Sequence, residues 1–419
     1  MLYRRTFNKP KFCNLFCLLS LLLLSFQLKA QSLEDLKILA AENNLGLKAE
    51  FAAFEAKLEA VNQAKSWQDP NLSFGYFISP IETRVGPQIA RFSLSQMLPW
   101  FGTYKVKGNI AAFRAEAAFE EFQDQKLKLF LEVAKQYYDL AAVRVIQQLE
   151  AEQLIILKDL KTLVRSNYEN NQAQLVDILR IDLDIEQQKT AIQVLQQQDQ
   201  AMLAQLNQLM NRDLRKPINM VNPKFILEQD NGVKLDSISI THPRLEVVRN
   251  LQKSNKAERV LAKKQALPQF GVGLDYAIIQ DRNVTAVDAG QDAIMPMLSV
   301  SLPIFGKKNR SRKQQVKLKG ESLQFQLENE EKKLVTEVQI MQYKQNELIK
   351  LVTLHEKQMM TLNDILSLST SALAKAEIQL EEILGLYQEH LLHHKMKIRT
   401  LANLQKTNAT LNYLTSNSK

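Results

Sequence analysis

Apolar and polar residues alternate in four short stretches of the chain, two between residues 71 and 98 and two between 269 and 303. Phe77 and Gln96 interrupt the pattern, but elsewhere in these stretches nearly every second residue is apolar and the others are small or polar. Alternation with a period of two predicts β-strands that have one apolar face. Turn-rich segments separate the members of each pair, so we expect two β-hairpins, at 71–98 and 269–303.

Helical patterns fill the rest of the chain. Residues 32–66 are rich in alanine, leucine, lysine and glutamate, and they are expected to form one helix. Each hairpin is then followed by more than a hundred residues without proline and with almost no glycine, which predicts helices far longer than those of ordinary globular domains.

An asparagine-rich segment at 167–172 divides the first long tract. Asparagine tolerates the left-handed conformation that closes many helices, so a turn is expected there. The tract then becomes a helical hairpin at 103–210, and its first helix spans roughly 100 Å if it has about 65 residues.

The returning helix of this hairpin carries a heptad repeat. Apolar residues follow steps of four and three over four heptads, which predicts coiled-coil packing, and only Gln188 and Asp199 are polar. The nine positions are Ile181, Ile185, Gln188, Ile192, Leu195, Asp199, Met202, Leu206 and Leu209.

The chain is an internal duplication. The sequence LPWFG, which ends the first hairpin and opens the first long helix, returns as LPIFG about two hundred residues later. A repeated transition of this kind indicates two copies of one structural plan. The strand-to-helix motif comprises Pro99, Phe101 and Gly102 in the first copy, and Pro303, Phe305 and Gly306 in the second.

Each predicted repeat contains a helix, a β-hairpin and a long helical hairpin. The expected division is a signal peptide at 1–30, a first repeat at 31–216, a linker at 217–234, a second repeat at 235–414, with its helical hairpin at 307–414, and a tail at 415–419.

The first thirty residues have the layout of a secretory signal peptide. A basic start precedes an apolar run from Leu15 to Phe26, and cleavage is expected after Ala30. The alternative is an uncleaved N-terminal anchor, although the run is shorter than a membrane-spanning helix needs. No other stretch approaches about 18 apolar residues, so the mature chain is expected to have no helical membrane span.

Charge and cysteine content exclude several classes of function. The formal charge is +9, but five basic residues lie in the leader, and the remaining chain has 49 basic and 45 acidic residues. Because the charges nearly balance, electrostatic attraction does not favour binding to nucleic acid. Cys13 and Cys17 both lie in the leader, so the rest of the chain has no disulfide or cysteine metal site. The sequence contains no phosphate-binding loop and no nucleophile–histidine constellation, so it does not predict an enzyme.

The predicted strands have the properties of membrane strands. Strands of about nine to eleven residues can cross a bilayer when they are tilted, and one apolar face opposite a polar one suits lipid outside and water inside. Four strands cannot close a barrel with a lumen, and open edges cannot lie in lipid. Membrane strands would therefore require oligomerisation, and three copies would supply twelve strands. A small soluble sheet packed on helices is the alternative.

The chain resembles the TolC family of outer-membrane efflux proteins, in particular the branch that works with cation and drug exporters. The resemblance covers residues 32–414 and rests on the duplicated plan, the two LP[WI]FG motifs and two tip segments that begin at Tyr168 and Leu373. It implies a mainly α-helical, duplicated fold. Each protomer would have long coiled-coil helical hairpins joined to four strands. The strands of three protomers would together form a 12-stranded barrel.

The resemblance also implies a function. The chain would be an outer-membrane exit duct of a Gram-negative bacterium, with a periplasmic helical extension, and neither an enzyme nor a protein with a cofactor. It would passively conduct substrate from an inner-membrane efflux pump and a periplasmic adaptor (membrane fusion) protein. It would form a homotrimer and contact outer-membrane lipid, and it would not bind nucleic acid. The alternatives are a periplasmic coiled-coil adaptor, whose Gly- and Val-rich domains are missing here, and a scaffold protein of an export complex.

The family's helical tips usually read Tyr-x-x-Gly, with an acidic residue six positions later. Asn171 and Ala376 stand at the two glycine positions, and alanine cannot replace glycine in a turn without strain, so the second turn could lie near residues 367–371 or be more regular. The resemblance assigns a periplasmic gate to Glu382 first, then to Glu381 and Asp177. It assigns adaptor docking to the tip residues Tyr168, Asn170, Asn171, Gln172, Ala376 and Glu377.

Three histidines have a spacing that could bind a metal. His390, His393 and His394 lie within one helical turn. Few acids lie nearby and no cysteine is available, which favours histidines that face solvent or a lumen. We therefore predict no metal site.

Overall fold

The structure, a computed structural model, describes residues 31–220, 242–281, 290–373 and 378–415. The predicted signal peptide, most of the predicted linker and the tip candidates Ala376 and Glu377 lie outside the described residues.

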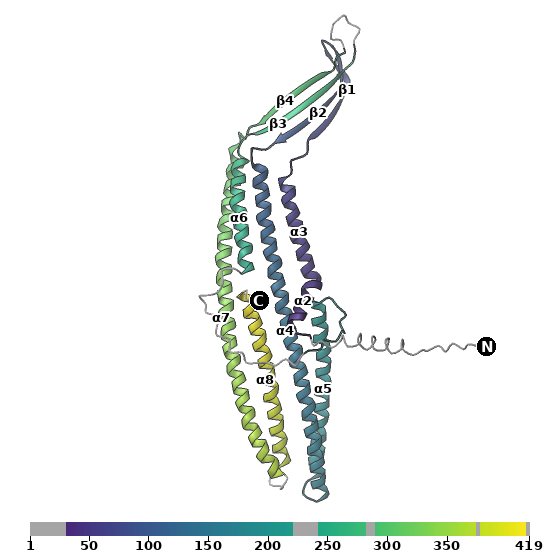
Figure 1. Cartoon of the computed structure of the whole chain (residues 1–419), viewed down its shortest axis with the longest axis vertical. Helices are drawn as coiled ribbons and strands as arrows, with labels where there is room; N and C mark the ends of the chain where they lie inside the picture. The colour runs from purple at the N-terminus through teal and green to yellow at the C-terminus, as the bar shows by residue number, and fades with distance from the viewer. Residues whose placement is uncertain (1–30, 221–241, 282–289, 374–377, 416–419) are drawn as a thin grey trace, which may run out of the picture. The chain divides into compact units, whose positions relative to one another are not determined.

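The described residues are mainly α-helical, and the four predicted strands are present. The predicted fold class is therefore confirmed (Figure 1). The helices are α2 (Leu33–Asn43), α3 (Leu45–Lys65), α4 (Thr103–Glu169), α5 (Leu175–Leu209), α6 (Pro243–Lys264), α7 (Gly306–Leu373) and α8 (Leu380–Leu414). The strands are β1 (Asn71–Thr83), β2 (Gly86–Leu98), β3 (Gln269–Ile279) and β4 (Ala293–Ser301).

The structure corrects one sequence expectation about helices and excludes one of two alternatives for the second tip. The single helix expected at 32–66 is broken at Asn44, which has an extended backbone, and its side-chain amide donates to the carbonyl oxygen of Leu209 at 2.9 Å. Residues 367–371 are helical within α7, so the second tip does not turn there. In both places the tertiary contacts and helix propagation outweigh the local sequence signal.

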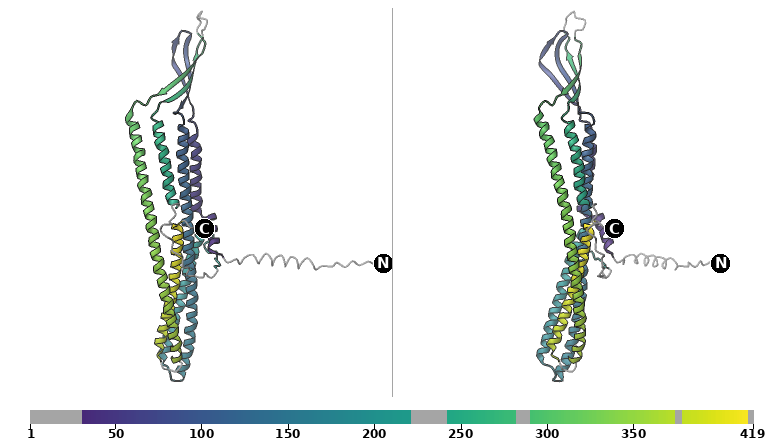
Figure 2. Two further views of the ribbon diagram at one scale, coloured as in Figure 1. Left: turned by 60° about the vertical axis from the view of Figure 1, so that its left-hand side comes forward. Right: turned by 90° about the vertical axis from the view of Figure 1, so that its left-hand side faces the viewer.

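The chain forms two compact units. Unit 1 contains the described residues of 1–45, 126–238 and 337–419, and unit 2 contains those of 46–125 and 239–336. Each unit draws on both halves of the chain. In unit 1, α5 runs back beside α4 and α8 runs back beside α7 (Figure 2).

Unit 1 is held together along the predicted heptad. Ile181, Ile185, Leu195 and Leu206 are buried, as the period requires. The two polar heptad positions have partners. Gln188 donates to the backbone carbonyl oxygen of Glu150 at 2.7 Å, and Asp199 accepts from Arg144 at 2.7 Å. Polar groups at the seam are therefore hydrogen-bonded rather than buried alone.

Unit 2 contains the β-sheet, whose strands are antiparallel in the order β1-β2-β3-β4. The two central strands come from different halves of the chain. The register places Phe74, Phe92, Tyr276 and Ile294 in one row across all four strands. Because side chains alternate between faces, this row and those two residues away form one apolar face.

Among the residues that the structure describes, every helix is either too short or too polar to span a lipid bilayer.

The two copies of the strand-to-helix motif differ in what they demand of glycine. Gly102 has φ +73°, and Lys264 donates to the carbonyl oxygen of the preceding Phe101 at 2.8 Å. Gly306 is the first residue of α7, has no positive φ, and a Cβ there would meet no heavy atom within 4 Å. Only the first glycine is required by backbone conformation.

We expect Gly102→Ala to destabilise the chain by about 1–2 kcal/mol, because a side chain in the left-handed region is strained. Gly306→Ala is the matched control, and it should be neutral or stabilising by up to ~1 kcal/mol because alanine favours helix. Thermal unfolding in detergent, followed by circular dichroism, measures both. Equal losses in the two variants would contradict this reading of the motif.

Candidate functional site

The tip of the α4–α5 hairpin is closed by an asparagine. Asn171 has φ +56°, and the backbone N–H of Gln172 donates to the carbonyl oxygen of Asn167 at 2.8 Å. Asparagine thus takes the left-handed position that glycine usually holds after a helix. Tyr168, Asn170, Asn171 and Gln172 are all exposed on the single chain.

Asp177 caps the first turn of α5. Its carboxylate accepts a hydrogen bond from the backbone N–H of Gln174 at 2.9 Å. A carboxylate at a helix N-terminus satisfies an unpaired N–H and is favoured by the helix dipole. This gate candidate therefore has a local structural role.

Glu381 and Glu382 lie in the first turn of α8 and differ in their surroundings. The carboxylate of Glu381 forms an ion pair with Arg180 of α5 at 2.7 Å. Glu382 is exposed and forms no ion pair with any residue that the structure describes. Of the three gate candidates, Glu382 is the one whose charge is neither paired nor used as a helix cap within the described ranges.

Sequence reasoning missed Arg180. It follows Asp177 by one helical turn, but its equivalent in the second repeat is Gly385, so the comparison of repeats carried no signal for it. The sequence offered one general signal, which is that a basic residue near the start of α5 could pair with the acidic residues at the start of α8.

A hydrophobic cluster holds the first turn of α8 in place. Leu380, Ile383 and Leu384 of α8 are buried against residues of α4 and α5, including Val164 and Ile181. Glu381 and Glu382 lie between Leu380 and Ile383 in sequence. Burial of these flanking residues therefore orients the helix turn that carries the acidic pair.

A buried polar network crosses unit 1 farther along the same helices. Glu150 of α4 is 3% exposed and forms an ion pair with Lys395 of α8 at 2.8 Å. Gln188 of α5 contacts the same residue, so three helices meet at one carboxylate. A cavity of about 650 Å³ adjoins it, lined among others by Leu195 and Arg399.

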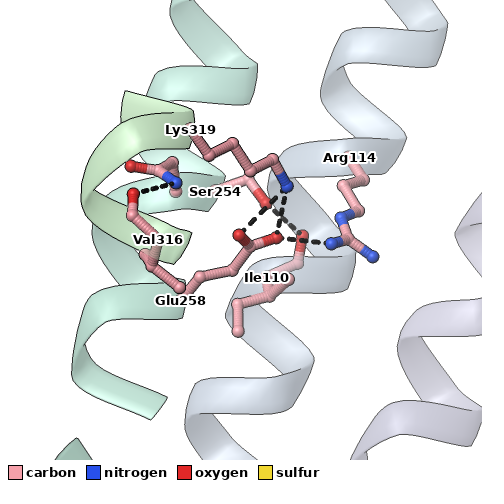
Figure 3. A network of polar contacts seen from close by, with 7 residues as sticks. Ile110, Arg114, Ser254, Glu258, Val316 and Lys319 are labelled. Atoms are coloured by element: carbon pink, nitrogen blue, oxygen red, sulfur yellow. Dashed lines mark hydrogen bonds and ion pairs between the residues drawn. The ribbon is translucent and has the colours of Figure 1, made fainter. Parts of the chain in front are cut away.

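Unit 2 has a comparable junction of three helices (Figure 3). Glu258 of α6 binds Lys319 of α7 at 3.0 Å and also pairs with Arg114 of α4. Burial raises the pKa of the Glu258 carboxyl, but the hydrogen bonds and charges of Lys319 and Arg114 outweigh burial and hold this pKa below its usual value of 4.5. The carboxylate therefore remains charged and links the three helices.

The apolar face of the sheet is exposed on the single chain. Leu72 and Tyr76 on the β1 edge are each 67% exposed, and Leu298 on the β4 edge is 87% exposed. The outer edges of β1 and β4 are unpaired within the described part of the chain. A continuous exposed apolar surface of this kind indicates contact with lipid or with another protein.

The structure adds His355 of α7 to the three histidines of α8. The Nδ1 atoms of His355 and His393 are 3.2 Å apart, and the rings of His390 and His394 are in edge contact. Sequence reasoning missed His355 because it lies 35 residues before His390 and on the opposite helix of the hairpin. Across the described residues, no three His, Cys, Asp or Glu side chains are arranged to hold a metal ion.

The histidine cluster disfavours protonation. Burial lowers the pKa of His355, His390 and His394, and neighbouring histidines lower it further. Gln358 opposes the effect at His355, and Glu152 opposes it at His394. These histidines are therefore neutral at neutral pH.

No family model matches the sequence, and no curated protein matches it. Solved structures do match. VceC from Vibrio cholerae, an outer membrane protein, has a TM-score of 0.75 at 14% identity, over 91% of this chain and 95% of that chain. The CmeC outer membrane channel of Campylobacter jejuni gives 0.74 at 13%, over 93% and 90%. The open state of the MtrE outer membrane channel of Neisseria gonorrhoeae gives 0.73 at 15%, over 91% and 88%.

The chain has the fold of these outer-membrane channels. At this level of identity the likeness establishes the fold, and the match covers nine-tenths or more of the chain. The tip of the α4–α5 hairpin, the four strands and the histidine cluster are therefore parts of an outer-membrane channel fold.

We expect the stability of the folded chain to fall as the pH drops below about 6.5. A group whose pKa is lowered by folding stabilises the chain above its ordinary pKa, and this contribution is lost as the pH falls through the folded-state value. The double variant His355→Gln/His390→Gln should lose less melting temperature between about pH 7.5 and about pH 5.5 than the unmodified chain.

Glu347→Gln serves as the control for this measurement. It removes an exposed carboxylate that pairs with Lys344 and leaves all four histidines and the groups beside them in place, so it should retain the full pH dependence. The same pH dependence in the double variant and the unmodified chain would show that the cluster contributes nothing to it.

Proposed function

We propose that the chain is a passive exit duct of the outer membrane, with no enzymatic activity and no cofactor. The observation that carries this proposal is the exposed apolar face of a four-stranded sheet with two unpaired edges. Lipid accepts the apolar face, but an unpaired backbone group in lipid costs several kcal/mol. Both edges must therefore be paired with strands of other chains.

Three copies satisfy this requirement. Twelve strands suffice to close a barrel around a water-filled lumen, and β4 of one copy would pair with β1 of the next. The opposite face of the sheet, which consists mostly of small and polar residues and methionine, would line that lumen. The channel fold of the solved neighbours supports this arrangement.

The helices would extend into the periplasm, where the chain is directed by a cleaved signal peptide at 1–30. We propose that the tips receive a periplasmic adaptor protein through Tyr168, Asn170, Asn171 and Gln172, together with Ala376 and Glu377. An inner-membrane pump would supply the energy. In this proposal the chain consists of two structural repeats, at 31–216 and 235–414, which are joined by a linker at 217–234.

The gate is assigned to Glu382, with Glu381 and Asp177 as secondary candidates. Three copies of an unpaired carboxylate around a narrow opening would attract cations and repel one another. Arg180 offsets the charge of Glu381, and the N-terminus of α5 offsets that of Asp177. These contacts support Glu382 as the dominant charge at the tip.

The first measurement is the stoichiometry of the mature chain, extracted from membranes in detergent, by light scattering with detergent subtraction. We expect three chains per particle, recovered from the outer-membrane fraction. A monomer released without detergent would overturn the duct, because the four strands would then form a small soluble sheet.

A matched pair of variants identifies the face that contacts lipid. Leu298→Arg places a charge on the apolar face and should reduce recovery in the outer membrane, since arginine near the bilayer midplane costs about 2–4 kcal/mol. Ser299→Arg lies on the opposite face and should be recovered as a trimer. Equal recovery of the two variants would contradict the assignment of faces.

Neutralising the gate should change conduction. We expect Glu382→Gln to raise leakage in single-channel recordings and to reduce the preference for cations, because a ring of three carboxylates is lost. Glu347→Gln is the control, since this exposed carboxylate forms a surface pair with Lys344 far from the tip. Recordings of Glu382→Gln that match those of the unmodified channel would exclude the ring.

A further inference from the structure

The four strands contain very few charged residues. Apart from Glu82 near the end of β1, the strands hold only Arg91 on β2 and Asp275 on β3. These two side chains form an ion pair and a hydrogen bond, with the guanidinium donating to Oδ2 of the carboxylate. The two charges come from different halves of the chain and meet on the central strands.

The register places both residues on the face opposite the exposed apolar row. Asp275 lies across from Ser93, and Arg91 lies across from Ala277 and Gly75. Phe92 and Tyr276, which alternate with them, belong to the apolar row. On this face Gly75, Ser93 and Ala277 are small and uncharged. Met295 of β4 lies across from Asp275, so the directly opposed residues on this face add no other charge beside the pair.

The members of the pair differ in exposure. The side chain of Arg91 is 44% exposed and that of Asp275 is 4% exposed. The second carboxylate oxygen, Oδ1, is buried and has no hydrogen-bond partner in the described ranges. The guanidinium thus covers the carboxylate and is the charge that this face presents to water.

We propose that the Arg91–Asp275 pair sets the charge selectivity of the barrel lumen. This inference rests on the proposed function. Three pairs would give the lumen wall no net charge at this level, so this level of the barrel favours solutes of neither sign. Loss of either member would leave three like charges on the wall, and such a ring biases permeation in a water-filled pore. The bias acts within a Debye length, about 10 Å at 0.1 M salt.

The test is the reversal potential of single channels in a planar bilayer under a salt gradient. Relative to the unmodified channel, Arg91→Gln should shift the ratio of cation to anion permeability upward by about twofold or more, and Asp275→Asn should shift it downward by a similar factor. The charge-swapped double variant, Arg91→Asp with Asp275→Arg, should return the ratio to that of the unmodified channel.

The outcomes separate this inference from the duct itself. Open channels with an unchanged ratio in both single variants would mean that the pair only fixes strand register. Absence of any channel from the unmodified protein would reject the proposed function instead.

Ser73→Asp keeps the test decisive if the single variants do not insert. Ser73 is exposed, lies across from Ser93 on the same face and is diagonal to Arg91, so the substitution adds one net negative charge per chain to this face while both members of the pair are kept. It should shift permeability toward cations. Unchanged permeability in Ser73→Asp would show that this face does not line the conducting path, and the inference would fall.

Discussion

The backbone groups at the two outer edges of the sheet impose the strongest constraint on this molecule. Each edge strand carries a row of N–H and C=O groups that the described chain does not pair, beside an apolar face that water does not favour. A soluble sheet would shield such edges with charge or shorten them, but β1 has 13 residues and β4 has none that is charged. The edges are built to be continued by other strands.

In the helical parts, polar groups that lie within a long apolar seam are paired with partners on neighbouring helices. Gln188 and Asp199 interrupt the heptad, and each meets a partner on α4. Glu150 and Glu258 each join three helices in their own unit. Removing one member of such a junction leaves a buried charge unpaired, so these residues also fix which helices can pack together.

Periodicity made most of the fold predictable. Alternation gives the strands, the lack of proline and glycine gives the long helices, and Asn171 was expected at the first turn for the same reason that it adopts a positive φ. The pairings between elements were not predictable from one sequence. Arg180 with Glu381, His355 with His393 and Arg91 with Asp275 bring together residues 38 to 201 positions apart, and no local pattern encodes such a distance. Of the two alternatives for the second tip, the turn near 367–371 is excluded because helix propagation in α7 outweighs its serines and threonine.

The central pairing of β2 with β3 determines the order in which the chain can mature. Arg91 and Asp275 are 184 residues apart, so the sheet cannot be completed until β3 and β4, in the first part of the second repeat, have been synthesised. Pairings of such high sequence separation form slowly, and an apolar hairpin exposed in the meantime is prone to aggregation. The hairpin of β1 and β2 therefore spends the longest time without its neighbours, and it is the segment whose apolar face stays exposed longest while the chain folds.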